Sequence, residues 1–266
     1  MSSLAVAGLQ LDIAWEDPAE NFRRAEALAA RAAAAGARLL VLPEMFNTGF
    51  SMAAERVATH AAATRDFLAN LARRHGTWVL AGYAEPAGGE AAPRPRNACA
   101  LLRPDGSEAL RYHKIHPFSL AGEDQHFSGG TALPTAEVEG VRVTALICYD
   151  LRFPEPFRAA ATDTDLFVVV ANWPDRRVQA WSTLLAARAI ENQAYVLGVN
   201  RVGEGDGLAH SGRSALHNPM GELEASLANQ AGLLLGTVEP AQVAEARQRF
   251  SFLADRRPQV YRGLER

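Results

Sequence analysis

Three side chains able to carry out acyl transfer stand in three separate segments of the chain. Glu44 directly follows the apolar run LLVLP, Cys148 directly follows VTALI, and Lys114 lies in the polar segment RYHKIHPF. Ligands in α/β proteins gather at the carboxyl ends of strands, so residues that follow apolar runs are the first candidates for chemistry. A carboxylate, an ammonium and a thiol in one site suit attack on a carbonyl or nitrile carbon.

In this chemistry the carboxylate takes the thiol proton, the thiolate attacks the carbon, and the ammonium stabilises the oxyanion that develops. The carboxylate then returns its proton to the leaving amine and activates water to hydrolyse the thioester. The chemistry requires no histidine and no cofactor.

Cys148 has a simpler interpretation, because a free cysteine at the end of a buried strand is usually an inert small hydrophobe. Its context favours reactivity. The segment YDLRFPE follows it and Pro154 can open a helix, which places the thiol at a strand-to-helix turn. There the backbone N–H of Tyr149 can face an oxyanion, and the helix N-terminus favours the thiolate. Cys99, in the middle of the strand NACALL, is interpreted as a core residue.

Each remaining group also has an ordinary alternative. Glu44 could be a strand-end carboxylate paired with an arginine, and Lys114 a surface lysine. His113 and His116 flank Lys114, but their spacing matches no standard zinc motif, so we expect no metal site. The GxSxG segment of serine hydrolases is absent from the sequence.

Apolar runs and helical patterns alternate along much of the chain, which predicts a mixed α/β fold. Pro18 suits a first helical turn, and Gly36 and Gly76 suit helix ends. No helix is expected between Asn97 and Tyr149, and 86–96 is an exposed loop. The predicted strands are 4–11, 38–43, 77–83, 97–103, 141–149, 165–172, 194–200 and 233–239, and the predicted helices are 18–36, 64–76, 179–193 and 241–249. With no repeat and no break in composition, residues 1–266 are interpreted as one domain.

Composition narrows the possible partners. The net charge of −3 disfavours a protein that neutralises nucleic-acid phosphates. Two cysteines in 266 residues suit a reducing compartment. The opening segment MSSLAVAGLQLD lacks the basic region of a signal peptide, and no uninterrupted apolar stretch reaches the roughly 18 residues of a membrane span. We therefore expect a soluble, cytoplasmic enzyme without nucleic-acid or membrane partners.

The three segments together resemble the nitrilase superfamily of carbon–nitrogen hydrolases, whose signature is a Glu–Lys–Cys triad in that order. The matching motifs are LPEMF, YHKIHPF and ICYDLRFPE, and the similarity runs from VAGLQLDIAWEDPAENF to FLADRRPQVY. The resemblance implies a four-layer α-β-β-α sandwich. It also implies that Glu123, in AGEDQHF, is a second glutamate that positions Lys114 and Cys148.

Two segments, LPEMFNTGFS and ANWPDRRVQAWSTLLAARAIENQAYV, look most like the ω-amidases of that superfamily. This resemblance implies hydrolysis of the terminal amide of 2-oxoglutaramate or 2-oxosuccinamate, with release of ammonia. It also implies a homodimer formed through helices and the C-terminal segment. The alternatives are a different carbon–nitrogen substrate, such as a nitrile, an N-carbamoyl amine or another amide, or a non-catalytic protein that binds a metabolite.

Substrate binding is assigned to the residues nearest these motifs. A substrate that carries a carboxylate needs a cationic partner, and the candidates are Arg152, Arg176 and Arg177. For Arg152 we prefer an ion pair with Asp150 that braces the cysteine turn, and Arg176 and Arg177 could simply be solvated. A narrow pocket would use aromatic side chains to exclude bulky amides, and the candidates are Phe118, Tyr149 and Trp173.

Overall fold

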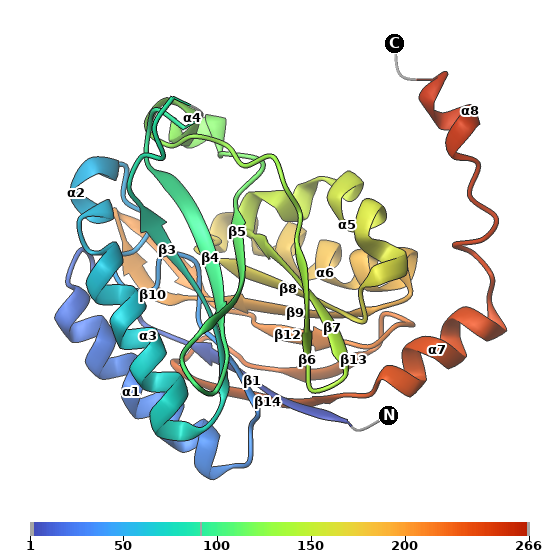
Figure 1. Ribbon diagram of the computed structural model, residues 1–266, viewed down its shortest axis with the longest axis horizontal. Helices are drawn as coiled ribbons and strands as arrows, with labels where there is room; N and C mark the ends of the chain where they lie inside the picture. The colour runs from blue at the N-terminus through green and yellow to red at the C-terminus, as the bar shows by residue number, and fades with distance from the viewer. Residues whose placement is uncertain (1–2, 91, 265–266) are drawn as a thin grey trace.

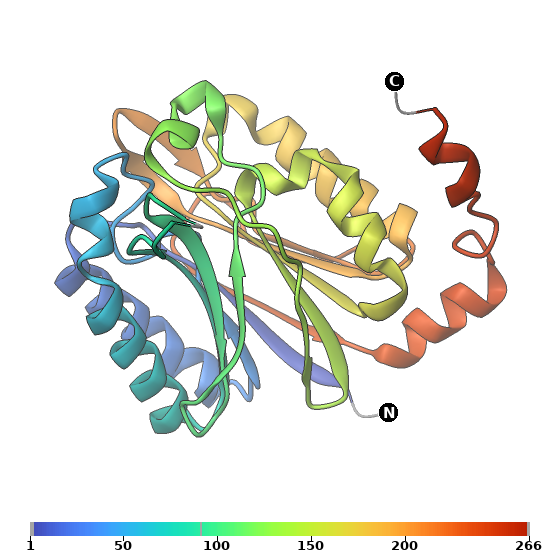
Figure 2. The same cartoon turned by 45° about the horizontal axis from the view of Figure 1, so that its top comes forward.

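Two six-stranded sheets pack face to face and carry helices on their outer faces, which gives four layers in the order α-β-β-α (Figure 1). The computed structural model describes residues 3–90 and 92–264. Figure 2 shows the same layers from another side, with the two sheets between two layers of helices. The expected four-layer sandwich is confirmed.

The first sheet has the strand order β14-β1-β2-β3-β4-β5. Its central strands β1, β2 and β3 run parallel, whereas β14, β4 and β5 are antiparallel to their neighbours. Because β4 is antiparallel to both β3 and β5, strand β5 runs in the same direction as β3 and β2. The carboxyl ends of β5 and β2 therefore lie at the same edge of the sheet. The bounds are β1 Leu4–Gln10, β2 Leu39–Val41, β3 Trp78–Glu85, β4 Arg96–Leu102, β5 Glu108–His113 and β14 Gly232–Val238.

The second sheet has the order β13-β12-β9-β8-β7-β6, with β7, β8 and β9 parallel at its centre. A separate hairpin, β10-β11, lies beside it. The bounds are β6 Thr135–Val138, β7 Val141–Ile147, β8 Leu166–Ala171, β9 Tyr195–Asn200, β10 Val202–Gly205, β11 Leu208–Ser211, β12 Ala215–His217 and β13 Leu223–Ser226.

Helices α1 and α3 cover the first sheet, and α5 and α6 cover the second (Figure 1). Past α7, the chain through α8 stands away from the sandwich (Figure 1). No helix of the described residues combines the length and apolar character needed to cross a membrane. The bounds are α1 Pro18–Ala34, α2 Ala54–Ala58, α3 Ala61–His75, α4 Glu123–His126, α5 Pro154–Ala160, α6 Val178–Asn192, α7 Pro240–Arg249 and α8 Pro258–Arg262.

The period-two alternation of strand side chains explains how one sheet serves two apolar cores. In β1, Leu4 and Val6 belong to the core shared with the second sheet, whereas Ala7 and Leu9 pack in the core beneath α1 and α3. Gly8 allows the sheets to approach, because a Cβ there would lie 3.0 Å from a methyl group of Val199. Both faces of the central strands are therefore buried, as their near-continuous apolar sequence requires.

Most predicted elements are present within a few residues of their expected ends. Pro18 opens α1, and Gly76 ends α3 in the left-handed conformation. The expectation of no helix between Asn97 and Tyr149 is wrong, since the short helix α4 lies there. The expectation missed α4 because one helical turn carries no periodic pattern. The predicted loop 86–96 includes residue 91, and the opening segment includes residues 1–2; these three positions lie outside the described residues.

Candidate functional site

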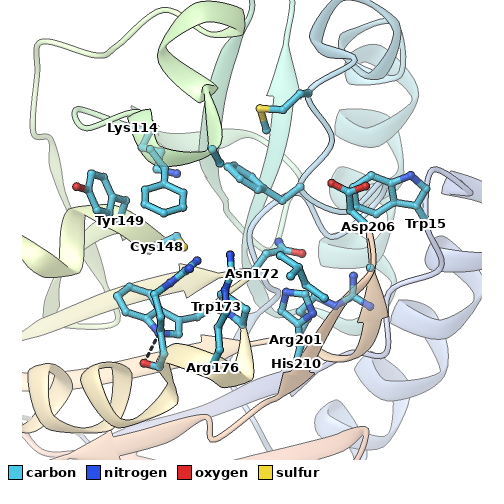
Figure 3. Close-up of a pocket in the computed structure, with 18 of the residues that line it drawn as sticks. Trp15, Lys114, Cys148, Tyr149, Asn172, Trp173, Arg176, Arg201, Asp206 and His210 are labelled. Carbon is cyan, nitrogen blue, oxygen red and sulfur yellow. Dashed lines mark hydrogen bonds between the residues drawn. The ribbon is translucent and has the colours of Figure 1, made fainter.

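Glu44, Lys114 and Cys148 follow the carboxyl ends of β2, β5 and β7 and meet where the two sheets face each other. The Lys114 ammonium donates to Glu44 Oε1 at 3.0 Å and to Glu123 Oε2 at 2.8 Å. Figure 3 shows Lys114 and Cys148 at the same end of a cavity. The structure thus brings together all four residues proposed from the sequence for catalysis.

Glu44 is fully buried and held at both carboxylate oxygens. The Asn97 side-chain amide donates to Oε1 at 2.7 Å, and the backbone N–H of Asn172 donates to Oε2 at 2.9 Å. The Glu44 backbone lies close against β3, where a Cβ at Gly82 would come within 2.7 Å of the Glu44 Cα. Any side chain at position 82 would clash with the Glu44 backbone, so only glycine allows this approach. Gly82 thus helps to fix the position of the Glu44 carboxylate.

Glu123 is the first residue of α4 and is also fully buried. The Asn97 amide donates to Glu123 Oε1 at 2.8 Å, so a single amide bridges both glutamates. The backbone N–H of Phe118 donates to the other oxygen of Glu123 at 2.5 Å. These contacts hold the second carboxylate beside Lys114.

The charges in this cluster compensate one another. Burial alone would lower the pKa of Lys114, but Glu123 and Glu44 outweigh it and raise that pKa above its ordinary range. Burial raises the pKa of Glu123, which Lys114 opposes and Glu44 reinforces. Lys114 therefore stays an ammonium at neutral pH, which is the charge state that the role expected from the sequence requires.

Cys148 begins a short 3₁₀ helix and has a positive φ of 45°, a strained conformation for a residue with a side chain. Asp150 fixes this turn. Its carboxylate accepts hydrogen bonds from the backbone N–H of Ile147 (3.0 Å), the Tyr112 hydroxyl (2.7 Å) and the backbone N–H of His116 (3.0 Å). The predicted strand-to-helix turn is confirmed, and Pro154 opens α5 as expected.

The expected preference for the thiolate is wrong for this arrangement. Burial raises the pKa of the Cys148 thiol well above its ordinary value, and the Glu44 charge and hydrogen bond raise it further. Lys114 acts in the opposite direction but does not prevail. The thiol is therefore protonated at neutral pH and has Glu44 as a nearby proton acceptor.

One cavity joins the thiol to every substrate-binding residue proposed from the sequence. Phe118 and Tyr149 lie with their ring centroids 4.7 Å apart, and the Trp173 indole N–H donates to the Arg177 carbonyl oxygen at 2.8 Å. Aromatic rings thus form much of the wall. Besides Lys114 and Cys148, the lining includes Trp15, Phe50, Met52, Phe118, Ala121, Tyr149, Arg152, Asn172, Trp173, Arg176, Arg177, Arg201, Asp206 and His210.

The expected ion pair between Arg152 and Asp150 does not form. Asp150 is occupied by the turn that it braces, and Arg152 turns instead toward the cavity wall, with its Cζ 4.9 Å from the centroid of a Trp173 ring. Arg177 is half-buried rather than simply solvated, with its Cζ 5.1 Å from the centroid of the Phe118 ring.

The two histidines that flank Lys114 point to different partners. His113 Nε2 lies 2.8 Å from Glu85, and His116 Nδ1 lies 2.8 Å from Asp150. Within residues 3–90 and 92–264, no group of three or more histidine, cysteine or acidic side chains is arranged to hold a metal ion. Cys99 lies buried in the core, as expected.

Sequence reasoning missed two asparagines that hold Glu44. Asn172 directly follows the apolar run of β8, so the rule that selected Glu44 and Cys148 would also have selected it. Asn97 is the second residue of the antiparallel strand β4, where no comparable rule applies. Both residues position the carboxylate, and neither carries a group reactive enough to attract notice alone.

The fold and this cluster define a carbon–nitrogen hydrolase of the nitrilase type. Residues 5–248 match the family described as "Carbon-nitrogen hydrolase", and the chain belongs to that family. It is 39% identical over 249 residues to an omega-amidase of Yersinia enterocolitica, with 92% of this chain and 89% of that protein covered. It is 30% identical over 263 residues to a 2-oxoglutaramate amidase of Bacillus subtilis, with coverage of 96% and 98%.

A solved structure agrees with these relatives. A CN-hydrolase superfamily protein of Xanthomonas campestris, crystallised with an arsenic adduct in its active site, superposes with a TM-score of 0.90 at 32% identity, covering 97% of this chain and 98% of the other. The chain is thus an enzyme of the carbon–nitrogen hydrolase family that acts on amides.

Proposed function

We propose that this enzyme hydrolyses the terminal amide of a short 2-oxo dicarboxylic acid monoamide, 2-oxoglutaramate or 2-oxosuccinamate, to the 2-oxo acid and ammonia. Relatives that cover most of the chain are an omega-amidase and a 2-oxoglutaramate amidase, which supports this substrate class. The observation that carries the mechanism is the placement of Lys114 between Glu44 and Glu123 beside the Cys148 thiol.

In the acylation step, the Cys148 sulfur attacks the amide carbon as its proton passes to Glu44. Because the thiol is protonated at rest, this transfer must accompany attack. The oxyanion that forms is stabilised by the Lys114 ammonium and the backbone N–H of Tyr149. Glu44 then gives its proton to the departing nitrogen, the carbon–nitrogen bond breaks, and ammonia leaves a thioester on Cys148.

In the deacylation step, Glu44 takes a proton from water, and the resulting hydroxide attacks the thioester carbon. The same donors stabilise the second oxyanion, and the carbon–sulfur bond breaks to release the acid. Glu44 returns its proton to the sulfur. Glu123 takes no proton in this sequence; it holds Lys114 in position and keeps it charged.

The aromatic wall limits the substrate's size. Phe118 and Tyr149 pack against each other, and the Tyr149 and Phe153 rings form an edge-to-face pair with their centroids 5.1 Å apart. Trp173 is almost fully buried and fixed by its indole hydrogen bond. Rings held in this way cannot move aside easily, so a bulky amide is excluded while a short chain fits.

The test is ammonia release from 2-oxoglutaramate, glutamine, a simple aliphatic amide and an aliphatic nitrile. Wild type should strongly prefer the 2-oxo amide, and Cys148→Ala should abolish turnover. Cys99→Ala is the matched control, because it removes the other thiol from the core and should preserve activity. Full activity in Cys148→Ala would refute the mechanism, and turnover of only another compound would refute the substrate.

We also propose that the enzyme is a homodimer formed in part by the C-terminal segment. Phe252, Val260, Tyr261 and Leu264 are exposed apolar side chains of this segment, and Ile190 of α6 lines the same surface hollow as Phe252 and Tyr261. Exposed apolar side chains of this kind are typical of a surface covered in an assembly. Sedimentation analysis should give twice the chain mass, and a monomer at micromolar concentration would contradict the proposal.

A further inference from the structure

The cations that line the cavity fall into two groups according to what neutralises them. Lys114 lies between two carboxylates, and Arg201 lies 3.8 Å from the Asp12 carboxylate and donates to three backbone carbonyl groups. Arg152, Arg176 and Arg177 form no ion pair with any described residue. The cavity that contains the candidate nucleophile therefore carries three arginine side chains that pair with no carboxylate of the described residues, although Asp206 also lies in its lining.

Two of these arginines are held by aromatic rings. Arg177 lies over Phe118 and Arg152 over Trp173, with Cζ-to-centroid distances of 5.1 and 4.9 Å. The Trp173 indole N–H donates to the Arg177 carbonyl oxygen, which links the two pairs. Contact with a ring leaves the in-plane N–H donors of a guanidinium free, and neither arginine side chain donates a hydrogen bond to a described residue.

Arg177 and Cys148 line the same cavity. Burial lowers the pKa of Arg177, and the neighbouring charges of Arg176 and Arg152 lower it further, while Cys148 acts in the opposite direction. A half-buried cation among like charges is stabilised by any anion that binds beside it. The proposed substrates bring such an anion, since each carries a carboxylate at one end and the scissile amide at the other.

We propose that Arg177 binds the substrate carboxylate, with Arg152 as a second hydrogen-bond donor. This inference rests on the proposed function. The planar fork of a guanidinium matches the two oxygens of a carboxylate, and the ring beneath it fixes its orientation. The carboxylate then lies at the arginine pair while the amide carbon lies at the Cys148 sulfur. This arrangement selects amides that carry a carboxylate over neutral amides of the same length.

The kinetic test compares 2-oxoglutaramate and glutaramate with neutral pentanamide in wild type and Arg177→Gln. The variant should lose about 10- to 100-fold in kcat/KM for both anionic amides, mainly through KM, because charge-assisted hydrogen bonds are lost. Turnover of pentanamide should change less than about threefold. Arg177→Lys should recover part of the loss, because it restores the charge but not the fork.

Arg103→Gln provides the matched control, because it removes an exposed arginine that bonds Ser107 and Glu108 outside the cavity. It should behave as wild type on all three amides. An equal loss on neutral and anionic amides in Arg177→Gln would overturn the proposal, since Arg177 would then support the site as a whole. Unchanged kinetics in that variant would overturn it as well.

A binding measurement separates this proposal from the proposed function. Calorimetric titration of 2-oxoglutarate into Cys148→Ala and into Cys148→Ala/Arg177→Gln requires no turnover. The second protein should bind at least about tenfold more weakly, consistent with loss of a charge-assisted contact. Equal affinities would overturn the role of Arg177 even if the enzyme is an ω-amidase, and a tenfold loss would uphold it even if the preferred amide is another anionic one.

Discussion

The two ends of the cavity that contains Cys148 differ in how their charges are neutralised. Around Cys148, the Lys114 ammonium lies between two buried carboxylates, and Asn97 bridges both of them. Around Arg177, the cations contact aromatic rings and have no acidic partner among the described residues. A cluster that satisfies its own charges can hold reacting groups still, whereas cations without counter-ions are suited to a charged ligand.

Backbone strain accompanies the cluster around Cys148. Cys148 and Met45, which adjoins Glu44, adopt positive φ angles of 45° and 41° without being glycine. Such conformations cost of order 1–3 kcal/mol each and persist only where neighbouring contacts enforce them. Here the Asp150 hydrogen bonds and the close approach of Gly82 supply that constraint. The segments that carry Glu44 and Cys148 are therefore strained, but strain is not confined to them, since Asp206 in the cavity lining has a φ of 51°.

The largest expected effect concerns the base. Glu44→Gln keeps the shape of the side chain but removes its capacity to accept the thiol proton, so kcat should fall about 10²- to 10⁴-fold for anionic and neutral amides alike. Burst and steady-state kinetics should both slow, because Glu44 acts in acylation and deacylation. Wild-type rates in both phases would remove Glu44 from the base role.

Glu85→Gln is the control for that variant. Glu85 is likewise a buried carboxylate of the first sheet, but it contacts Tyr83, Arg111 and His113 away from the cavity. Its turnover should stay close to that of wild type. A comparable loss in Glu85→Gln would show that the effect of Glu44→Gln reflects damage to the sheet rather than lost chemistry.

The next largest effect is on the free energy of unfolding, which should differ between variants at the two ends of the cavity. Lys114→Met leaves Glu44 and Glu123 buried without their cation and should lower the free energy of unfolding by about 3–5 kcal/mol. Arg177→Met removes a cation that pairs with no carboxylate, so its free energy of unfolding should stay within about 0.5 kcal/mol of wild type. Urea titrations at neutral pH measure both values, and equal losses would abolish the distinction between the ends.

The smallest effect is a shift in pH dependence. Burial and Glu44 raise the pKa of the Cys148 thiol, so alkylation by iodoacetamide should be slow near neutral pH and accelerate in alkaline solution. Removing the negative charge in Glu44→Gln should move this profile to lower pH even though turnover falls. Cys99 should not react, since burial raises the pKa of its thiol too. Rapid neutral labelling of wild type, or a profile displaced to higher pH in Glu44→Gln, would contradict the electrostatic account.

The sequence located the residues that we propose to react better than those that hold them. Glu44 and Cys148 follow apolar runs, and parallel strands carry such positions to one edge, so their meeting could be expected. Lys114 lacked that signal because β5 has a polar, half-exposed sequence, and only the combined motifs identified it. Its complete burial came from α4 and the bridging amide of Asn97, which are tertiary contacts without a local pattern.

The error over Arg152 has a related cause. Arg152 and Asp150 are close in sequence and opposite in charge, which favours a local pair. In the structure, the Asp150 carboxylate instead accepts hydrogen bonds from the Tyr112 hydroxyl and from the backbone N–H groups of Ile147 and His116. Tyr112 lies in β5, so this alternative partner becomes apparent only once the position of β5 is known. Proximity in the sequence predicts which charged side chains can form a pair. It does not predict which hydrogen-bond donors from distant segments contact the carboxylate in the folded structure.

Cys148 is proposed to form a thioester with the substrate, and rapid-quench mass spectrometry tests this step most directly. Wild type mixed with 2-oxoglutaramate and quenched in acid within the first turnover should carry, on the peptide that contains Cys148, the mass of the acyl group left after ammonia departs. The adduct should be absent in Cys148→Ala. Turnover without any adduct on Cys148, or an adduct on another residue, would contradict the account.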